Sequence, residues 1–282
     1  VAEQMGGVSY LFFLRELEKR MEKDWEGIHR TLKEIRRFLI NRGTVLLNLT
    51  LDQDSWSQVE PGMQGLLKSL PDAAEAVSCR WSPGSPPRFE AMTLPAQVNY
   101  VGKGARLYDL GYRFHGSALV ITRYLRNSWL WDRIRVQGGA YGAFCLFDRF
   151  SGVLSFLSYR DPNLLETLEV FDRSGDVLEA AEITDKELNK AIIGAIGDMD
   201  APMLPDAKGY ASMLRHLTGD SEPLRQKVRD EILGTEAADF RDFGEILKQA
   251  AARGIVKVLG SQDAVEEARK KRPGWLKEIH VL

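Results

Sequence analysis

Residues 138–159 read GGAYGAFCLFDRFSGVLSFLSY, and this stretch decides the fold. Two runs of apolar and aromatic residues flank a polar segment near Asp148–Gly152, a pattern that predicts two strands joined by a turn. The next residues, Asp161, Pro162 and Asn163, predict the start of a helix, with Asp161 as its cap and Pro162 in its first turn. We therefore predict an α+β fold with mixed, largely antiparallel sheets.

Apolar periodicity predicts further elements on both sides of this hairpin. Extended, strand-like residues cover Phe89–Tyr100, Ile255–Leu259 and Glu278–Leu282. Helices are predicted over Ser117–Trp131, Asp185–Gly197, Ala207–Leu217, Glu222–Leu233, Ala237–Ala252 and Asp263–Lys270. Together with the hairpin, these elements predict one complete α+β domain over residues 88–282.

The amino-terminal part begins with a helical stripe over Tyr10–Leu39. Its apolar members recur every three or four positions: Leu14, Leu17, Met21, Trp25, Ile28, Leu32, Ile35 and Leu39. We predict that the stripe faces a core and that Asp24 caps a second helix within it. A strand over Thr44–Leu51 and a helix over Trp56–Leu70 follow. Proline, glycine and serine then predict a linker over residues 76–87.

A possible repeat relates the two parts. Residues 35–54 read helix end, Arg-Gly, apolar run, Asp-Gln-Asp and helix; residues 246–263 read helix end, Arg-Gly, apolar run, Ser-Gln-Asp and helix. The alternative is that helix–Arg-Gly–strand is simply a common connection. Taken as a repeat, the pattern predicts that residues 1–75 are the carboxyl-terminal part of a truncated α+β domain.

Composition excludes several classes of protein. The 282 residues include 38 Lys and Arg against 40 Asp and Glu, and this balance argues against a nucleic-acid partner. The longest stretches without charge, Ala91–Gly102 and Val136–Phe147, are shorter than the roughly 18 apolar residues of a membrane span, so we predict no membrane insertion. Two cysteines, Cys79 and Cys145, provide no disulfide framework.

Familiar catalytic motifs are missing from the sequence. The histidines His29, His115, His216 and His280 are too scattered to place two imidazoles on one helical turn, so we predict no metal site in this chain. No nucleophile elbow, Walker loop or dinucleotide fingerprint occurs. Cys145 lies in an apolar strand, where a buried, inert thiol is the usual case.

One segment does combine groups that could act on a substrate. Arg135, Gly138, Gly139 and Tyr141 lie in a cationic turn that leaves an aromatic helix and enters a strand. The glycines permit positive φ and close approach of another backbone, Tyr141 supplies a phenol donor, and Arg135 supplies a permanently charged fork. The pair could hold an extended peptide and stabilise an oxyanion. The alternative is an ordinary helix cap before a core strand.

Longer motifs resemble a known family. RVQGGAYGAFCLFD (135–148), SGVLSFLSYRDPNLLETLEVFD (151–172), QVNYVGKG (97–104) and LPDAKGYASMLRHL (204–217) are similar to the carboxy-terminal half of the presequence proteases. These are organellar, pitrilysin-type, inverted-motif zinc metallopeptidases, and the plant and green-algal type is the most similar. The resemblance covers essentially the whole chain.

The resemblance implies a fold, an activity and partners. The fold would be that of the mitochondrial-processing-peptidase-like metallohydrolases, with helices packed on one face of each sheet. The full protein would be a zinc endopeptidase of the mitochondrial matrix or chloroplast stroma that degrades cleaved presequences and other short unfolded peptides. Its zinc would be bound by a complementary amino-terminal half that this chain lacks, so that this chain alone would be inactive.

The resemblance also implies residue roles. Tyr141 would bind the scissile carbonyl as it becomes tetrahedral, Arg135 would fix the substrate and Tyr141, and both would be catalytic; substrate would also contact Gly138 and Gly139. The alternatives are a non-catalytic peptide-binding or scaffold subunit of the same superfamily, and a separate chaperone-like peptide binder. The retained Arg135 and Tyr141 favour the enzyme.

Overall fold

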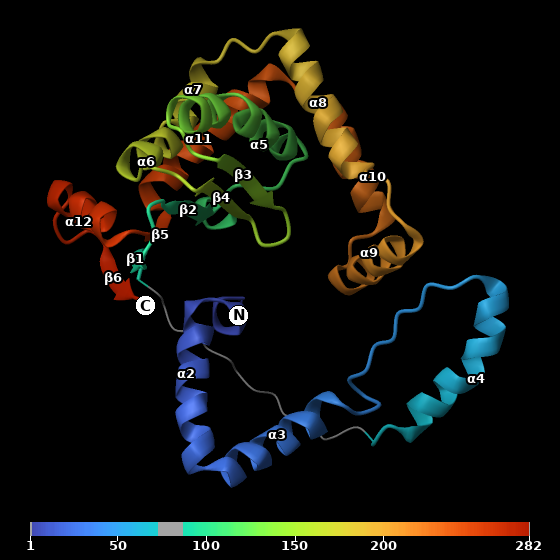
Figure 1. Ribbon diagram of the computed structural model, residues 1–282. Coiled ribbons are helices and arrows are strands. Elements are labelled where there is room, and N and C mark those ends of the chain that lie inside the picture. The colour runs from blue at the N-terminus through green and yellow to red at the C-terminus, as the bar shows by residue number, and fades with distance from the viewer. Residues whose placement is uncertain (1, 73–86, 282) are drawn as a thin grey trace. The chain divides into compact units, whose positions relative to one another are not determined.

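The computed structural model describes residues 2–72 and 87–281 (Figure 1). Contacts divide them into two compact units: described residues of 1–85 with 203–219, and those of 86–202 with 220–282. The domain boundaries predicted from the sequence, 1–75 and 88–282, remain a prediction. Except for Pro87, the predicted linker lies outside the described residues, as does Cys79.

The second unit contains one mixed sheet of six strands in the order β3-β4-β2-β5-β1-β6. Neighbours from β3 to β5 are antiparallel, and β1 runs parallel to both β5 and β6. The predicted α+β class with a mixed, largely antiparallel sheet is therefore confirmed. The strands are β1 (Phe89–Thr93), β2 (Tyr100–Arg106), β3 (Gly142–Asp148), β4 (Val153–Tyr159), β5 (Ile255–Gly260) and β6 (Lys277–His280).

Helices lie on one face of this sheet. Figure 1 shows α5, α6, α7 and α11 on the same side of the strands, and Val101, Leu154 and Val258 are fully buried between the two layers. The unit's helices are η1 (Leu107–Leu110), α5 (Ser117–Asn127), η2 (Trp131–Gln137), α6 (Leu165–Asp172), α7 (Ser174–Ala180), α8 (Asp185–Met199), α10 (Glu222–Leu233), α11 (Ala237–Arg253) and α12 (Gln262–Lys271).

Three local predictions about this unit are wrong. The strand-like stretch 89–100 stops at Thr93, because Pro95 cannot donate to a ladder, and β2 starts at Tyr100. The helix from Ser117 ends at Asn127, before the π-helix η2. Asp161 does not cap α6: it is fully buried, and its carboxylate accepts from the Thr167 hydroxyl at 2.7 Å.

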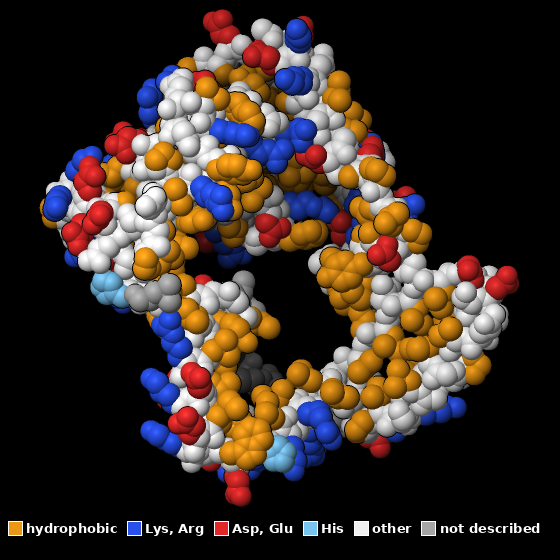
Figure 2. All heavy atoms as spheres, viewed as in Figure 1, with side chains coloured by type: hydrophobic (Ala, Val, Ile, Leu, Met, Phe, Trp, Pro, Cys, Tyr) orange, Lys and Arg blue, Asp and Glu red, His pale blue; other side chains and the backbone are white. Residues whose placement is uncertain are grey.

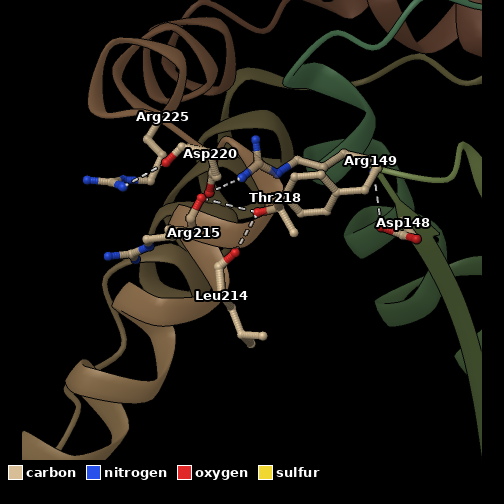
Figure 3. Close-up of polar contacts among 8 residues, drawn as sticks. Asp148, Arg149, Leu214, Arg215, Thr218, Asp220 and Arg225 are labelled. Carbon is tan, nitrogen blue, oxygen red and sulfur yellow. Dashed lines mark hydrogen bonds and ion pairs between the residues drawn. The ribbon is translucent and has the colours of Figure 1, made fainter. Parts of the chain in front are cut away.

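The tip of the β3–β4 hairpin is held in place by charge. Arg149 Nη2 lies 2.6 Å from Asp220 Oδ2, and only 6% of the Asp220 side chain is exposed (Figure 3). Arg225 donates to the backbone carbonyl of Asp220 at 3.1 Å, and the Tyr108 hydroxyl donates to the carbonyl of Arg149. Such a buried, multiply bonded pair fixes the hairpin tip against α10, since separating it would leave a desolvated charge.

The first unit consists of helices. They are α1 (Ala2–Gly6), α2 (Val8–Lys23), α3 (Trp25–Leu39), α4 (Gln53–Ser69) and α9 (Pro205–Thr218). The predicted cap Asp24 is confirmed, since its carboxylate accepts from the Gly27 N–H at 3.0 Å. The strand predicted over Thr44–Leu51 is wrong: no described strand of this unit lies beside the segment, and a strand without a hydrogen-bonded neighbour does not form.

The predicted core face of the amino-terminal stripe is also wrong in this chain. Of its members only Ile28 is buried, at 7% exposure. Apolar side chains lie open along these helices (Figure 2). Exposed members of the stripe are Leu14, Met21, Trp25, Leu32, Ile35 and Leu39. Periodicity gives a helix its apolar face, but burial needs a second layer, and this unit's described residues contain no sheet.

Candidate functional site

The predicted site begins in η2, a π-helical turn of a kind that is frequent at functional sites. The Arg135 carbonyl accepts from the Gly139 N–H at 3.1 Å, and the Ile134 carbonyl accepts from the Ala140 N–H at 3.0 Å. The Ala140–Ile134 bond joins residues six positions apart, whereas the corresponding bond of a Schellman motif joins residues five apart. The extra residue reflects the wider, π-helical turn that comes before it. The backbone thus turns sharply and leads into β3.

The two glycines serve different purposes. Gly139 has a φ of +77°, in the left-handed region that favours glycine, and Gly138 has an ordinary φ of −82°. A Cβ on Gly138 would lie 2.6 Å from the Ile134 carbonyl oxygen, so glycine is needed there for close approach. The Gly138 carbonyl accepts from Asn163 Nδ2 at 2.7 Å, which fastens the turn to the start of the α6 segment.

Tyr141 presents its phenol to solvent from a fixed backbone. Its N–H donates to the carbonyls of Tyr159, at 3.1 Å, and Arg160, at 3.3 Å, while 68% of the residue is exposed. The Tyr141 ring packs edge-on against the Tyr159 ring, with centroids 5.8 Å apart. Among the described residues no hydrogen bond uses the Tyr141 hydroxyl, so this group is available to donate to a substrate carbonyl.

Arg135 is also exposed and is not bonded to Tyr141. Its guanidinium lies over the Trp131 ring, 4.0 Å from the centroid, a cation–π distance. Among the residues that the structure describes, no hydrogen bond or ion pair uses the Arg135 side chain, so all five of its donors remain available. The structure therefore places Arg135 and Tyr141 at the two ends of one turn, each held separately.

Sequence reasoning missed the support behind Tyr141. The rings of Tyr100 and Tyr159 also meet edge-on, with centroids 5.4 Å apart. Arg160 has a φ of +49° and is the one non-glycine residue with positive φ in the described chain. The pKa of its guanidinium is raised, first by the nearby Tyr159 phenol and then by a hydrogen bond with Tyr100. The signal that could have revealed this cluster is strand register, since Gly142 lies opposite Tyr159.

Other predicted groups have no visible role. Burial raises the pKa of the Cys145 thiol, which keeps it protonated and unreactive. Within residues 2–72 and 87–281, no three His, Cys, Asp or Glu side chains come together in a way that could hold a metal ion. No helix in the same ranges combines the length and apolar character that crossing a membrane requires.

Solved structures of pitrilysin-type peptidases have this fold. Pitrilysin aligns with 82% of the chain, over 25% of its own length, with a TM-score of 0.51 at 16% identity. A protease from Helicobacter pylori aligns with 74% of the chain, over 53% of its own length, with a TM-score of 0.50 at 17% identity. At these identities the likeness shows a shared fold alone.

Sequence comparison identifies the family. The family model described as the PreP C-terminal domain matches residues 89–261. The chain is 47% identical over all 282 residues to "Presequence protease 1, chloroplastic/mitochondrial" of Arabidopsis thaliana, and 28% identical over 280 residues to "Presequence protease, mitochondrial" of Emericella nidulans. It spans 26% of the length of each. The chain belongs to the presequence protease family.

Proposed function

We propose that this chain is the substrate-closing, carboxyl-terminal part of a zinc metalloendopeptidase that degrades cleaved presequences and other short unfolded peptides. In this proposal Tyr141 donates to the scissile carbonyl oxygen as it becomes an oxyanion, and Arg135 holds the peptide beside it. The observation that carries the proposal is the Tyr141 phenol, which is exposed on a backbone fixed by two hydrogen bonds.

The chemistry of the pair supports these roles. A preorganised donor stabilises a developing oxyanion because it is already aimed when the charge appears. The planar guanidinium fork of an arginine matches peptide carbonyls and carboxylates. Trp131 holds that fork by its face and leaves the N–H edges free. Gly138 and Gly139 keep the adjacent backbone free of side chains, so an extended peptide can approach it closely.

The described residues do not fit a metal, so the proposal assigns the zinc, the attacking water and its base to the amino-terminal half of the full-length protein. That half is the main partner of this chain. The names of the relatives support a location in mitochondria or chloroplasts and support presequences as substrates. We expect this chain alone to show no peptidase turnover, and zinc-dependent cleavage by the isolated chain would contradict that expectation.

The test is Tyr141→Phe in a full-length presequence protease that contains this chain. Loss of one oxyanion donor predicts a fall in kcat of about 100-fold with little change in KM. Tyr210→Phe is the matched control, because Tyr210 is also exposed, at 58%, but lies on α9, away from the predicted site in sequence. An unchanged kcat with a raised KM would assign Tyr141 to ground-state binding and overturn the proposed role.

Arg135→Gln tests whether Arg135 binds the peptide, as proposed, while Tyr141 stabilises the oxyanion. If Arg135 binds the peptide, its loss raises KM, by roughly tenfold for a charged contact of about 1.4 kcal/mol, and lowers kcat less. Arg241→Gln is the control, since Arg241 is an exposed arginine on α11, far from the predicted site in sequence, and no hydrogen bond or ion pair among the described residues uses its side chain. A scaffold subunit would show neither effect, and normal turnover in both the Arg135 and Tyr141 variants would favour that alternative.

A further inference from the structure

Tyr141, the residue before β3, is the last of a row of three tyrosine rings, and the other two come from β2 and β4. Tyr100 meets Tyr159 at 5.4 Å between ring centroids and 73° between planes, and Tyr159 meets Tyr141 at 5.8 Å and 66°. Both contacts are edge-to-face, the geometry that the quadrupoles of aromatic rings favour. Tyr159 is thus the ring on which the Tyr141 ring rests.

Backbone hydrogen bonds to Tyr159 and its neighbour Arg160 fix the position of the Tyr141 backbone. Its N–H lies between two acceptors, the carbonyls of Tyr159 and Arg160. Arg160, which provides one of these carbonyls, has a φ of +49°, a conformation that costs an arginine about 1 kcal/mol or more. Strain of this kind persists only where surrounding contacts hold it in place, and the Arg160 guanidinium lies 5.6 Å from the centroid of the Tyr159 ring.

The register of the hairpin leaves room for this arrangement. Gly142 lies opposite Tyr159, and a Cβ on Gly142 would lie 3.2 Å from the Phe144 ring and 3.6 Å from the Tyr159 Cβ. A side chain at position 142 would therefore crowd the Phe144 ring and contact the base of the Tyr159 side chain. Tyr159 itself is 39% exposed, and its side chain points away from the helix-covered face that buries Phe156. Its ring is therefore not part of the hydrophobic core.

We propose that Tyr159 is a positioning residue: its ring fixes the direction of the Tyr141 phenol, with Tyr100 and the strained Arg160 as its supports. The inference rests on the proposed function of Tyr141 as the oxyanion donor. Tyr159 acts through Tyr141 and does not touch the substrate carbonyl in this account. A misdirected donor loses transition-state stabilisation more than substrate binding, because alignment matters most when the charge develops.

The experiment is a double-mutant cycle in a full-length presequence protease that contains this chain. Tyr159→Leu removes the ring, and Tyr159→Phe keeps the ring and serves as the matched control. We expect Tyr159→Leu to lower kcat by about threefold to tenfold, the equivalent of one lost edge-to-face contact, with KM nearly unchanged. Tyr159→Phe is expected to stay within about twofold of the parent enzyme, since packing of the rings does not need its hydroxyl.

The decisive comparison is made in the Tyr141→Phe background. There the donor hydroxyl is absent, so Tyr159→Leu should have no further effect on kcat. A purely structural role would lower activity equally in both backgrounds, and that additive result would overturn the inference. If Tyr159→Leu is too unstable to assay, Tyr100→Leu weakens the same support from further away and is tested in the same two backgrounds.

The two proposals fail in different ways. If Tyr141→Phe alone leaves kcat unchanged, the proposed function of Tyr141 is wrong and the positioning role falls with it. If Tyr141→Phe lowers kcat but Tyr159→Leu does not, the donor role stands and only the positioning role of Tyr159 is overturned.

Discussion

Residues 246–263 and residues 35–54 follow one pattern of helix end, Arg-Gly, apolar run, polar cap and helix, but they have different structures. In the later segment the apolar run is β5, hydrogen-bonded between β2 and β1. In the earlier segment the run forms no strand and pairs with no described strand. In both segments the helix that follows the run begins with a side-chain cap: Ser261 Oγ accepts from the Ala264 N–H, and Asp52 Oδ1 accepts from the Ser55 N–H.

The difference separates local from non-local determinants. A helix end, an Arg-Gly connection and a capped helix each need only a few neighbouring residues, so both segments form them. A strand needs a partner that its own sequence cannot supply. Val258 is fully buried in β5, whereas Leu47, its counterpart when Arg42-Gly43 is aligned with Arg253-Gly254, is 41% exposed. The earlier run has the composition of a strand without the neighbours of one.

The largest effect should come from a charge placed at these matched positions. Val258→Asp buries an unpaired carboxylate in the centre of the sheet, so we expect it to lower the free energy of unfolding of this unit by more than about 3 kcal/mol. Leu47→Asp should change stability by less than about 0.5 kcal/mol, because the side chain already contacts water. Urea denaturation followed by circular dichroism measures both, and equal losses would contradict the comparison.

Hydrogen exchange tests the same contrast without mutation. Amides of β5 should exchange only on opening of the whole sheet, more than about a thousandfold more slowly than unprotected amides. Amides of residues 45–51 should exchange close to the unprotected rate. Protection of residues 45–51 in the isolated chain would mean that a hydrogen-bonding partner exists for them, and the comparison would lose its basis.

These residues also show how much the sequence could predict. The β3–β4 hairpin, the Asp24 cap and helix α10 were predicted correctly because each depends on local pattern and turn chemistry. The sheet order and the pairing of β1 with β5, whose paired residues lie 167 positions apart (Phe89 with Val256), depend on the whole fold and could not be read locally.

The residues of the candidate site also fall into two groups, those that local sequence could predict and those that depend on the whole fold. Arg135, Gly138, Gly139 and Tyr141 are contiguous, so a short motif and a family resemblance were enough to select them. Tyr100 and Tyr159 join Tyr141 only through strand register, so no motif names them together. The prediction that Asp161 caps a helix was wrong because it relied on local sequence alone. In the fold the Asp161 carboxylate is buried and accepts a hydrogen bond from the Thr167 hydroxyl.

A smaller effect is expected at the caps. Ser261→Ala removes the acceptor for the Ala264 N–H, bonded at 3.1 Å, and should lower the stability of the second unit by about 1 kcal/mol. Ser261→Asp is the matched control, because aspartate is an equally good cap and should keep stability within about 0.5 kcal/mol. A Ser261→Ala variant as stable as the parent would show that the α12 cap is not coupled to unfolding of the sheet.

The smallest expected effect is the loss of the Asp52 cap at low pH, which should loosen the first turn of α4. The pKa of Asp52 is lowered, chiefly by the hydrogen bond from the Ser55 backbone N–H and then by the Ser55 side chain. Since the folded helix prefers the ionised carboxylate, the cap contributes stability above the ordinary aspartate pKa of about 4 and loses it as the pH falls through the lowered value. The first turn of α4 should therefore fray as the pH falls below the ordinary aspartate pKa of about 4, whereas Ser261 caps α12 with a hydroxyl that does not titrate. Carbon chemical shifts of residues 53–56 report this fraying, and Asp52→Asn, which caps without titrating, should remove the pH dependence. A titration that persists in the Asp52→Asn variant would assign it to another carboxylate and remove the contrast between the two caps.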